Sequence, residues 1–199
     1  MTPQSIITLA RDPLNDTNAV TPRQSNAELV RAVNAGIKEI SILLPALFTR
    51  IRTYTTVLGV KQALDFSEDQ SLVDVLRITN GAALTRFDRR ALDAFEPTWT
   101  TRTAGVVQQW SPIDGDPLGF LTYPPATEAQ SLDVQSVRVP TEYALADEIT
   151  ELPGSFEPAL AHFVIAFAET KDDEHVNSGR VSANYAAFLA LVKPGEPKA

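Results

Sequence analysis

Residues 25–57 read SNAELVRAVNAGIKEISILLPALFTRIRTYTTV, and this stretch contains the change from helix to strand on which the fold depends. Ser25 and Glu28 form a capping box, in which the serine oxygen accepts from the amide three residues on and the glutamate bonds back to the serine amide. Apolar residues then recur at steps of three and four, with polar residues between them: Leu29, Val33, Ile37, Ile40 and Leu44. We therefore predict a helix that begins at Ser25 and ends where Leu44 meets Pro45.

Downstream of Thr49 the pattern changes to that of strands. Residues 50–57 are rich in β-branched and aromatic side chains, and Leu58-Gly59 supplies a turn before residues 60–64, which together predict a hairpin. An Asn80-Gly81 turn should follow a strand over residues 71–79. A short helix is expected from Asp88 to Ala94, and three further strands at residues 105–110, 118–123 and 132–139. The middle of the chain is thus predicted to be a small sheet or barrel.

Helices are predicted on both sides of this β region. A short helix should run from Pro3 to Arg11 and stop there, because the residue before Pro13 is disfavoured in helical conformation. Residues 153–155 (PGS) should introduce a very apolar helix, with Ser155 as its N-cap and with a stripe made of Leu160, Phe163, Val164 and Phe167. A last helix is expected at residues 173–192, where small residues would allow close packing: Gly179, Ala183, Ala187 and Ala190.

These elements predict an α+β fold in a single domain, residues 1–199. A small helical bundle would consist of residues 1–48 and 141–192, with an antiparallel β-rich region inserted at 49–140. Residues 193–199 are polar, so we expect a flexible tail.

Composition narrows the functional classes. Forty-four per cent of the 199 residues are hydrophobic, which is enough for a substantial core, and there is no cysteine to form disulfides or thiolate metal sites. The formal net charge of −8 disfavours a protein built to hold nucleic acid, yet is compatible with an acidic wall around a DNA passage. The N-terminus does not resemble a secretory signal and no stretch is long enough to span a membrane, so we expect a soluble protein made in the cytoplasm.

The sequence offers little for catalysis. His162 lies among apolar residues, where a packed and hydrogen-bonded histidine is expected. His175 ends the run of residues 172–175 (DDEH), which could ligate a cation but is better explained as acidic residues at a helix N-terminus. Residues 114–116 (DGD) predict a turn, since the later ligands of a calcium loop are missing.

Nucleophile elbows, Walker loops and dinucleotide fingerprints do not occur, so we nominate no catalytic, cofactor-binding or metal-binding residues and expect no cofactor. A carboxylate pair brought together only by the fold is left open.

Two sets of residues suggest contacts with other molecules. Residues 86–90 (RFDRR), with Arg50, Arg52 and Arg77, form the densest positive cluster, which could touch phosphates but is interleaved with acids and is better interpreted as ion pairs within or between subunits. Trp99 and Trp110 could each be a core anchor or an interface hot spot.

A wider pattern consists of the N-terminal helices ending at Pro45, residues 97–99 (PTW) and 120–125 (FLTYPP) of the β region, and the alanine-rich helix hairpin that turns at residues 168–172 (AETKD) and continues through Gly179, Ala183 and Phe188. Taken along the whole chain, this pattern resembles the small head–tail adaptor (connector) proteins of tailed bacteriophages.

The resemblance implies a structural virion protein rather than an enzyme. It implies a homo-oligomeric ring of about twelve copies at the neck of the virion, beneath the dodecameric portal, which extends the DNA channel and docks the tail or nozzle proteins. Genomic DNA would pass through this channel during ejection without sequence-specific binding, and no membrane would be involved. The alternatives are another neck or tail protein without portal contact, such as a closure or nozzle subunit, and, more distantly, a small enzyme with an unrecognised carboxylate site.

Overall fold

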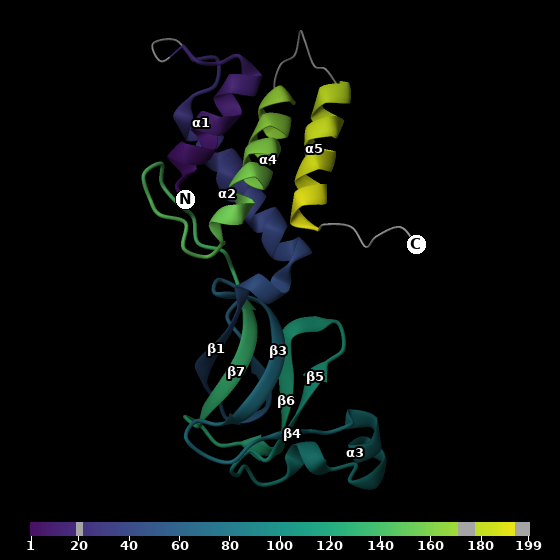
Figure 1. Cartoon of the computed structure of the whole chain (residues 1–199). Coiled ribbons are helices and arrows are strands. Elements are labelled where there is room, and N and C mark those ends of the chain that lie inside the picture. The colour runs from purple at the N-terminus through teal and green to yellow at the C-terminus, as the bar shows by residue number, and fades with distance from the viewer. Residues whose placement is uncertain (19–21, 171–177, 194–199) are drawn as a thin grey trace. The chain divides into compact units, whose positions relative to one another are not determined.

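The computed structural model describes residues 1–18, 22–170 and 178–193. The chain divides into two compact units, which are considered separately (Figure 1). Residues 1–47 and 140–199 form the helical unit, and residues 48–139 form the β unit. Together they give the predicted α+β fold.

Within its described residues, the helical unit contains four α-helices (Figure 1): α1 (Pro3–Leu14), α2 (Asn26–Leu43), α4 (Glu157–Glu169) and α5 (Ser178–Val192). α4 packs against α1, α2 and α5. This explains why α4 is so apolar, since most of its circumference is covered. Close approach of α2 and α4 requires Gly36, because a Cβ there would lie 2.9 Å from Cδ2 of Leu160.

The predicted start and end of α2 are confirmed. Ser25 is the N-cap, its side chain accepts from the Glu28 amide, and the Glu28 carboxylate accepts from the Ser25 amide. Leu44 is the C-cap immediately before Pro45. The local chemistry of this helix was sufficient to define both of its ends.

Two predicted helix boundaries were wrong. α1 does not stop at Arg11 but continues through Pro13 to Leu14, which is buried, and it ends where Asn15 adopts a left-handed conformation (φ 52°). Burial of Leu14 offsets the missing amide of Pro13 in the last turn. Ser155 is not a cap: it lies in a 3₁₀ turn, Gly154–Phe156, and α4 begins after it without a side-chain cap.

The last helix is described from Ser178, and the predicted first residues of this helix, the turn beyond Thr170 and the tail beyond Lys193 lie outside the described residues. Among the described residues, no helix is both long and apolar enough to span a membrane.

The β unit has two sheets (Figure 1). One has the order β1-β7-β3, with all pairs antiparallel, and the other has the order β2-β6-β5-β4, in which only β4 pairs parallel. The strands are β1 (Thr49–Thr55), β2 (Gly59–Ala63), β3 (Asp69–Ile78), β4 (Thr85–Arg86), β5 (Gln109–Ile113), β6 (Asp116–Ala126) and β7 (Ser131–Arg138). The short helix α3 (Arg89–Phe95) starts at its N-cap Asp88, as predicted.

The predicted hairpin of residues 50–64 is wrong. β1 pairs with β7 and β2 pairs with β6, so the two segments belong to different sheets. The side chain of Gln62 fills the space between them, accepting from the Val57 amide and from the Tyr54 hydroxyl. Strand propensity identified both strands, but it carries no information about their partners.

The strand predicted at residues 105–110 begins later, at Gln109. Upstream of it, the Val107 amide donates to Oε1 of Gln130 and the Gly105 carbonyl accepts from Nε2 of the same side chain. This glutamine side chain therefore adds to the backbone bonds of the segment, in which Gly105 forms an isolated bridge to Ala126 on β6. The core between the sheets is formed by Leu64, Val75, Leu84, Val107, Trp110, Phe120, Ala126, Leu132 and Val134.

Candidate interaction surfaces

His162, which lies in the described part of the chain, has a structural role. Its Nδ1 atom lies 2.9 Å from Oδ1 of Asn184 on α5, and the Asn184 amide donates to the Arg180 carbonyl of its own helix. The predicted packed and hydrogen-bonded histidine is thus confirmed. His175 lies outside the described residues.

The Asp114-Gly115-Asp116 segment is a turn, as predicted. Gly115 has a φ of +79°, which favours glycine, and Oδ1 of Asp116 accepts from the amides of Leu118 and Gly119. In the described part of the chain, no group of three or more His, Asp or Glu side chains is placed to hold a metal ion.

Both tryptophans are core residues of the β unit. The indole Nε1 of Trp99 donates to Oδ1 of Asp93 at 2.8 Å, and its ring packs edge-on against Phe87. Trp110 belongs to the main core, and its ring carries the guanidinium of Arg86 at 5.6 Å from the centroid. Only 2% of Trp99 and 4% of Trp110 are exposed, so both side chains are core anchors rather than exposed interface residues.

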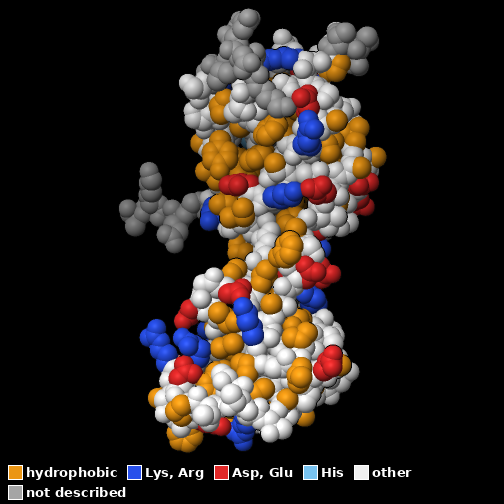
Figure 2. Space-filling view, turned by 180° about the vertical axis from the view of Figure 1, so that it is seen from behind, with side chains coloured by type: hydrophobic (Ala, Val, Ile, Leu, Met, Phe, Trp, Pro, Cys, Tyr) orange, Lys and Arg blue, Asp and Glu red, His pale blue; other side chains and the backbone are white. Residues whose placement is uncertain are grey.

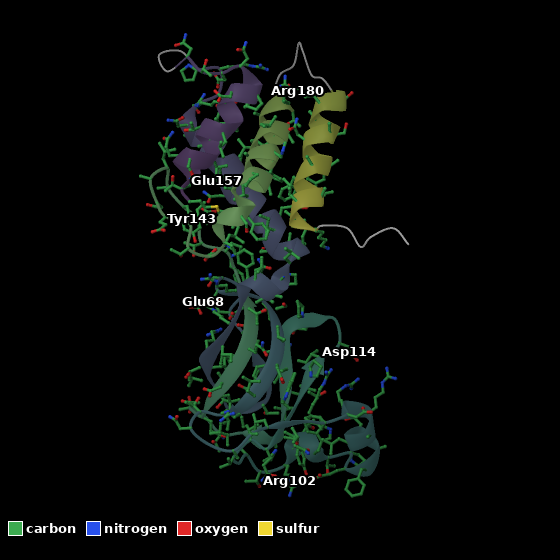
Figure 3. All side chains as sticks on the ribbon, viewed as in Figure 1. Glu68, Arg102, Asp114, Tyr143, Glu157 and Arg180 are labelled. Atoms are coloured by element: carbon green, nitrogen blue, oxygen red, sulfur yellow. The ribbon has the colours of Figure 1, made fainter. Side chains whose placement is uncertain are left out.

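Five of the six arginines of the predicted cluster fall into two groups, and the sixth, Arg77, is exposed on β3. Those of the first group have carboxylate partners. Arg50 and Arg52 from β1 both contact Asp69 and Glu68, and Arg89 pairs with Asp93 one turn along α3. The Asp69 side chain is fully buried and also accepts from Ser136 Oγ at 2.6 Å, whereas Glu68, labelled in Figure 3, is 56% exposed.

Arg86 and Arg90 form the second group, because no carboxylate lies within ion-pair distance of either among the described residues. Both line a cavity of about 540 Å³, and Arg86 also lines an adjoining cavity of about 420 Å³. We call the two cavities together the arginine groove. Figure 2 shows Lys and Arg side chains gathered on one side of the β unit.

The rest of the arginine groove is mixed in character. Asp88 and Asp114 line its cationic part, with Asp114 labelled in Figure 3 on the turn between β5 and β6. Leu72, Val73 and Trp110 form an apolar wall in the adjoining part. A surface with cations, acids and apolar side chains together is typical of protein contacts rather than of sites that follow a phosphate backbone.

The helical unit has an apolar groove of about 180 Å³ between α4 and α5. Phe163, Phe167 and Tyr185 line this groove together with Ala166, Thr170 and Val181. Beneath it, Phe163 packs against the buried Phe188 with ring centroids 5.1 Å apart, and Tyr185 lies next to both rings. The Tyr185 hydroxyl donates to Glu39 on α2, and this bond and burial together raise the pKa of Tyr185, with burial the larger cause.

Large apolar side chains are exposed on each unit. Ile42 (69%) and Leu191 protrude from the helical unit, and Phe66 (82%) and Phe95 (88%) from the β unit. Phe66 lies between β2 and β3, and Phe95 ends α3, so the two are on separate segments of the β unit. Exposed aromatic residues of this size are typical of contact surfaces.

Residues 141–148 of the helical unit carry three exposed acids and are called the acidic loop. Lys38 pairs with Glu142 at 2.7 Å and lowers the pKa of that carboxyl group. Asp147 accepts from the Ala144 amide, and Glu148 has no ion-pair partner among the described residues. Tyr143, labelled in Figure 3, is buried and fixes the loop to the helices.

No protein-family model matches the sequence, and no curated protein is significantly similar to it.

Proposed function

We propose that this chain is a head–tail adaptor of a tailed bacteriophage, a structural protein that forms a ring of about twelve copies beneath the portal. The proposal rests on the resemblance of the sequence pattern to that family. The observation in the structure that supports it is the presence of separate contact surfaces on the two units.

A subunit of a closed ring uses two different surfaces, one toward each neighbour, and further surfaces for whatever lies above and below. The arginine groove, the apolar groove between α4 and α5, and the exposed Phe66 and Phe95 provide such surfaces. Among the described residues, His162, Trp99 and Trp110 pack within the chain. The two grooves and the exposed phenylalanines therefore favour binding to other chains.

Native mass spectrometry of the full chain, alone and with the portal protein of the same virus, tests the proposal. The expected result is a complex of one portal ring with about twelve copies of this chain. The portal mixed with bovine serum albumin in place of this chain gives the background of non-specific association.

A chain that does not bind the portal but forms a ring by itself, or binds a tail protein, would instead be a closure or nozzle subunit. A chain that stays monomeric with all of these partners would contradict a neck function altogether.

A further inference from the structure

We propose that the arginine groove of one copy receives the acidic loop of the neighbouring copy in the ring. This inference rests on the proposed function, because it assigns one of the two lateral contacts that a ring subunit must make. It commits both surfaces to a second copy of this chain.

Each surface carries charges that have no ion-pair partner in the part of the chain that the structure describes. Among the described residues, no carboxylate lies within ion-pair distance of Arg86 or Arg90. Likewise, no described Lys or Arg lies within ion-pair distance of Asp147 or Glu148. All four residues are exposed. Two unpaired cations and two unpaired anions on different units are complementary between copies.

The acidic loop is held firmly by hydrogen bonds to the rest of the helical unit. The Leu145 carbonyl accepts from the Gln4 amide at 3.0 Å, and the Ile149 amide donates to the Met1 carbonyl at 2.9 Å. Asn34 bonds both the amide and the carbonyl of Tyr143. A loop fixed at both ends loses little conformational freedom on binding, which favours its use as an interface.

A protein segment suits the lining of the groove better than nucleic acid does. Asp88 and Asp114 line the same cavity as the arginines and would repel phosphates, whereas a protein segment can place its acids at Arg86 and Arg90 and its apolar atoms at the wall. The acidic loop has this composition, since Ala144, Leu145 and Ala146 precede Asp147 and Glu148.

The net charges of the two units favour a contact between the β unit of one copy and the helical unit of the next. The helical unit contains 8 Lys and Arg against 14 Asp and Glu, and the β unit contains 9 against 11. A ring that alternates the β unit of one copy with the helical unit of the next brings the less acidic part against the more acidic part.

Charge reversal tests the contact. The variant Arg86→Glu with Arg90→Glu, and separately Asp147→Arg with Glu148→Arg, should raise the protein concentration needed for ring formation at least about tenfold. Combining all four substitutions should restore assembly, because the pairs are then reversed rather than removed. Arg77→Glu and Glu128→Arg, at exposed positions outside both surfaces, serve as controls and should assemble like the parent chain.

Since Arg86 also stacks on Trp110, Arg90→Glu alone is a second variant that leaves this contact intact. It should weaken assembly in the same direction while urea unfolding of the β unit stays unchanged. Weakened assembly without rescue in the fourfold variant would overturn the proposal.

Cross-linking gives an independent readout, because the chain has no cysteine. Asp114→Cys, at the groove, and Ala146→Cys, in the acidic loop, leave all four proposed charges in place. When the two single variants are mixed and mildly oxidised in the assembled state, a disulfide between unlike chains should form. Thr53→Cys, exposed on β1, mixed with Ala146→Cys is the control.

The outcomes separate this inference from the proposed function. A ring that assembles with no cross-link above the control, and with no effect of charge reversal, overturns the assigned contact and leaves the adaptor proposal standing. A chain that forms no ring, alone or on the portal, overturns both.

Discussion

Replacing Asp69 by alanine is expected to destabilise the β unit far more than replacing its neighbour Glu68. Both carboxylates contact the same two arginines, Arg50 and Arg52. They differ in burial, since the Asp69 side chain is fully buried and that of Glu68 is 56% exposed. The pair therefore compares a buried carboxylate, which also accepts from Ser136, with an exposed carboxylate on the same two arginines.

The magnitude follows from what each change leaves behind. Asp69→Ala removes the acceptor of Ser136 and leaves two arginine side chains without their buried partner, which costs about 3–5 kcal/mol. Glu68→Ala removes contacts of 3.4 and 3.6 Å that are open to solvent, worth about 1 kcal/mol or less. Asp69→Asn, which keeps an acceptor for Ser136, should fall between the two.

Tryptophan fluorescence during urea unfolding is the assay. The chain has two tryptophans, Trp99 and Trp110, and both are buried in the β unit, so the signal follows this unit alone. With a dependence on urea of about 2 kcal/mol per M, the expected loss for Asp69→Ala lowers the unfolding midpoint by about 1.5–2.5 M.

Equal shifts for Asp69→Ala and Glu68→Ala would refute the reasoning, as would a loss below about 1 kcal/mol for Asp69→Ala. The first result would mean that burial does not set the strength of this ion pair. The second would mean that the arginines find other partners when Asp69 is removed.

Three further predictions concern single side chains. Ser25→Ala should lower helix stability by about 1 kcal/mol in thermal unfolding followed by circular dichroism, and Ser155→Ala by less than about 0.5 kcal/mol because it caps nothing; equal losses would contradict the assigned caps. Asp93→Ala should cost the β unit about 1–3 kcal/mol in the fluorescence assay by leaving the buried Trp99 indole without an acceptor, while Asp93→Asn retains most stability. Burial raises the pKa of Tyr54 above 10.0, so the free energy of unfolding should fall as pH rises through that value, and less steeply in Tyr54→Phe; identical slopes would exclude this tyrosine.

Local features of the sequence predicted the fold where short-range contacts decide it. The capping box at Ser25 and the turn at Asn80 involve residues within one turn of each other, and both are present. The hairpin prediction failed because the partners of β1 and β2 are more than fifty residues away, at β7 and β6. Alternation along a strand defines its faces but not its neighbour.

The candidate surfaces were only partly predictable. The arginine cluster was recognisable as a run of charges, but its division depends on the fold: Arg50 and Arg52 meet Asp69, whereas Arg86 and Arg90 border a groove. The acidic loop carried no signal of its own, because its exposure results from backbone bonds to the first residues of the chain. Contacts between segments distant in sequence therefore account for most of what was missed.

The two ends of the β unit are neighbours, because Thr49 at the start of β1 pairs with Val137 near the end of β7. Paired residues of antiparallel strands lie about 5 Å apart, so the chain leaves the helical unit and returns to it through adjacent points. An insert with adjacent ends can be gained, lost or exchanged during evolution without rethreading the helices around it. Related chains can therefore keep the same helical bundle and carry a different inserted domain at this position.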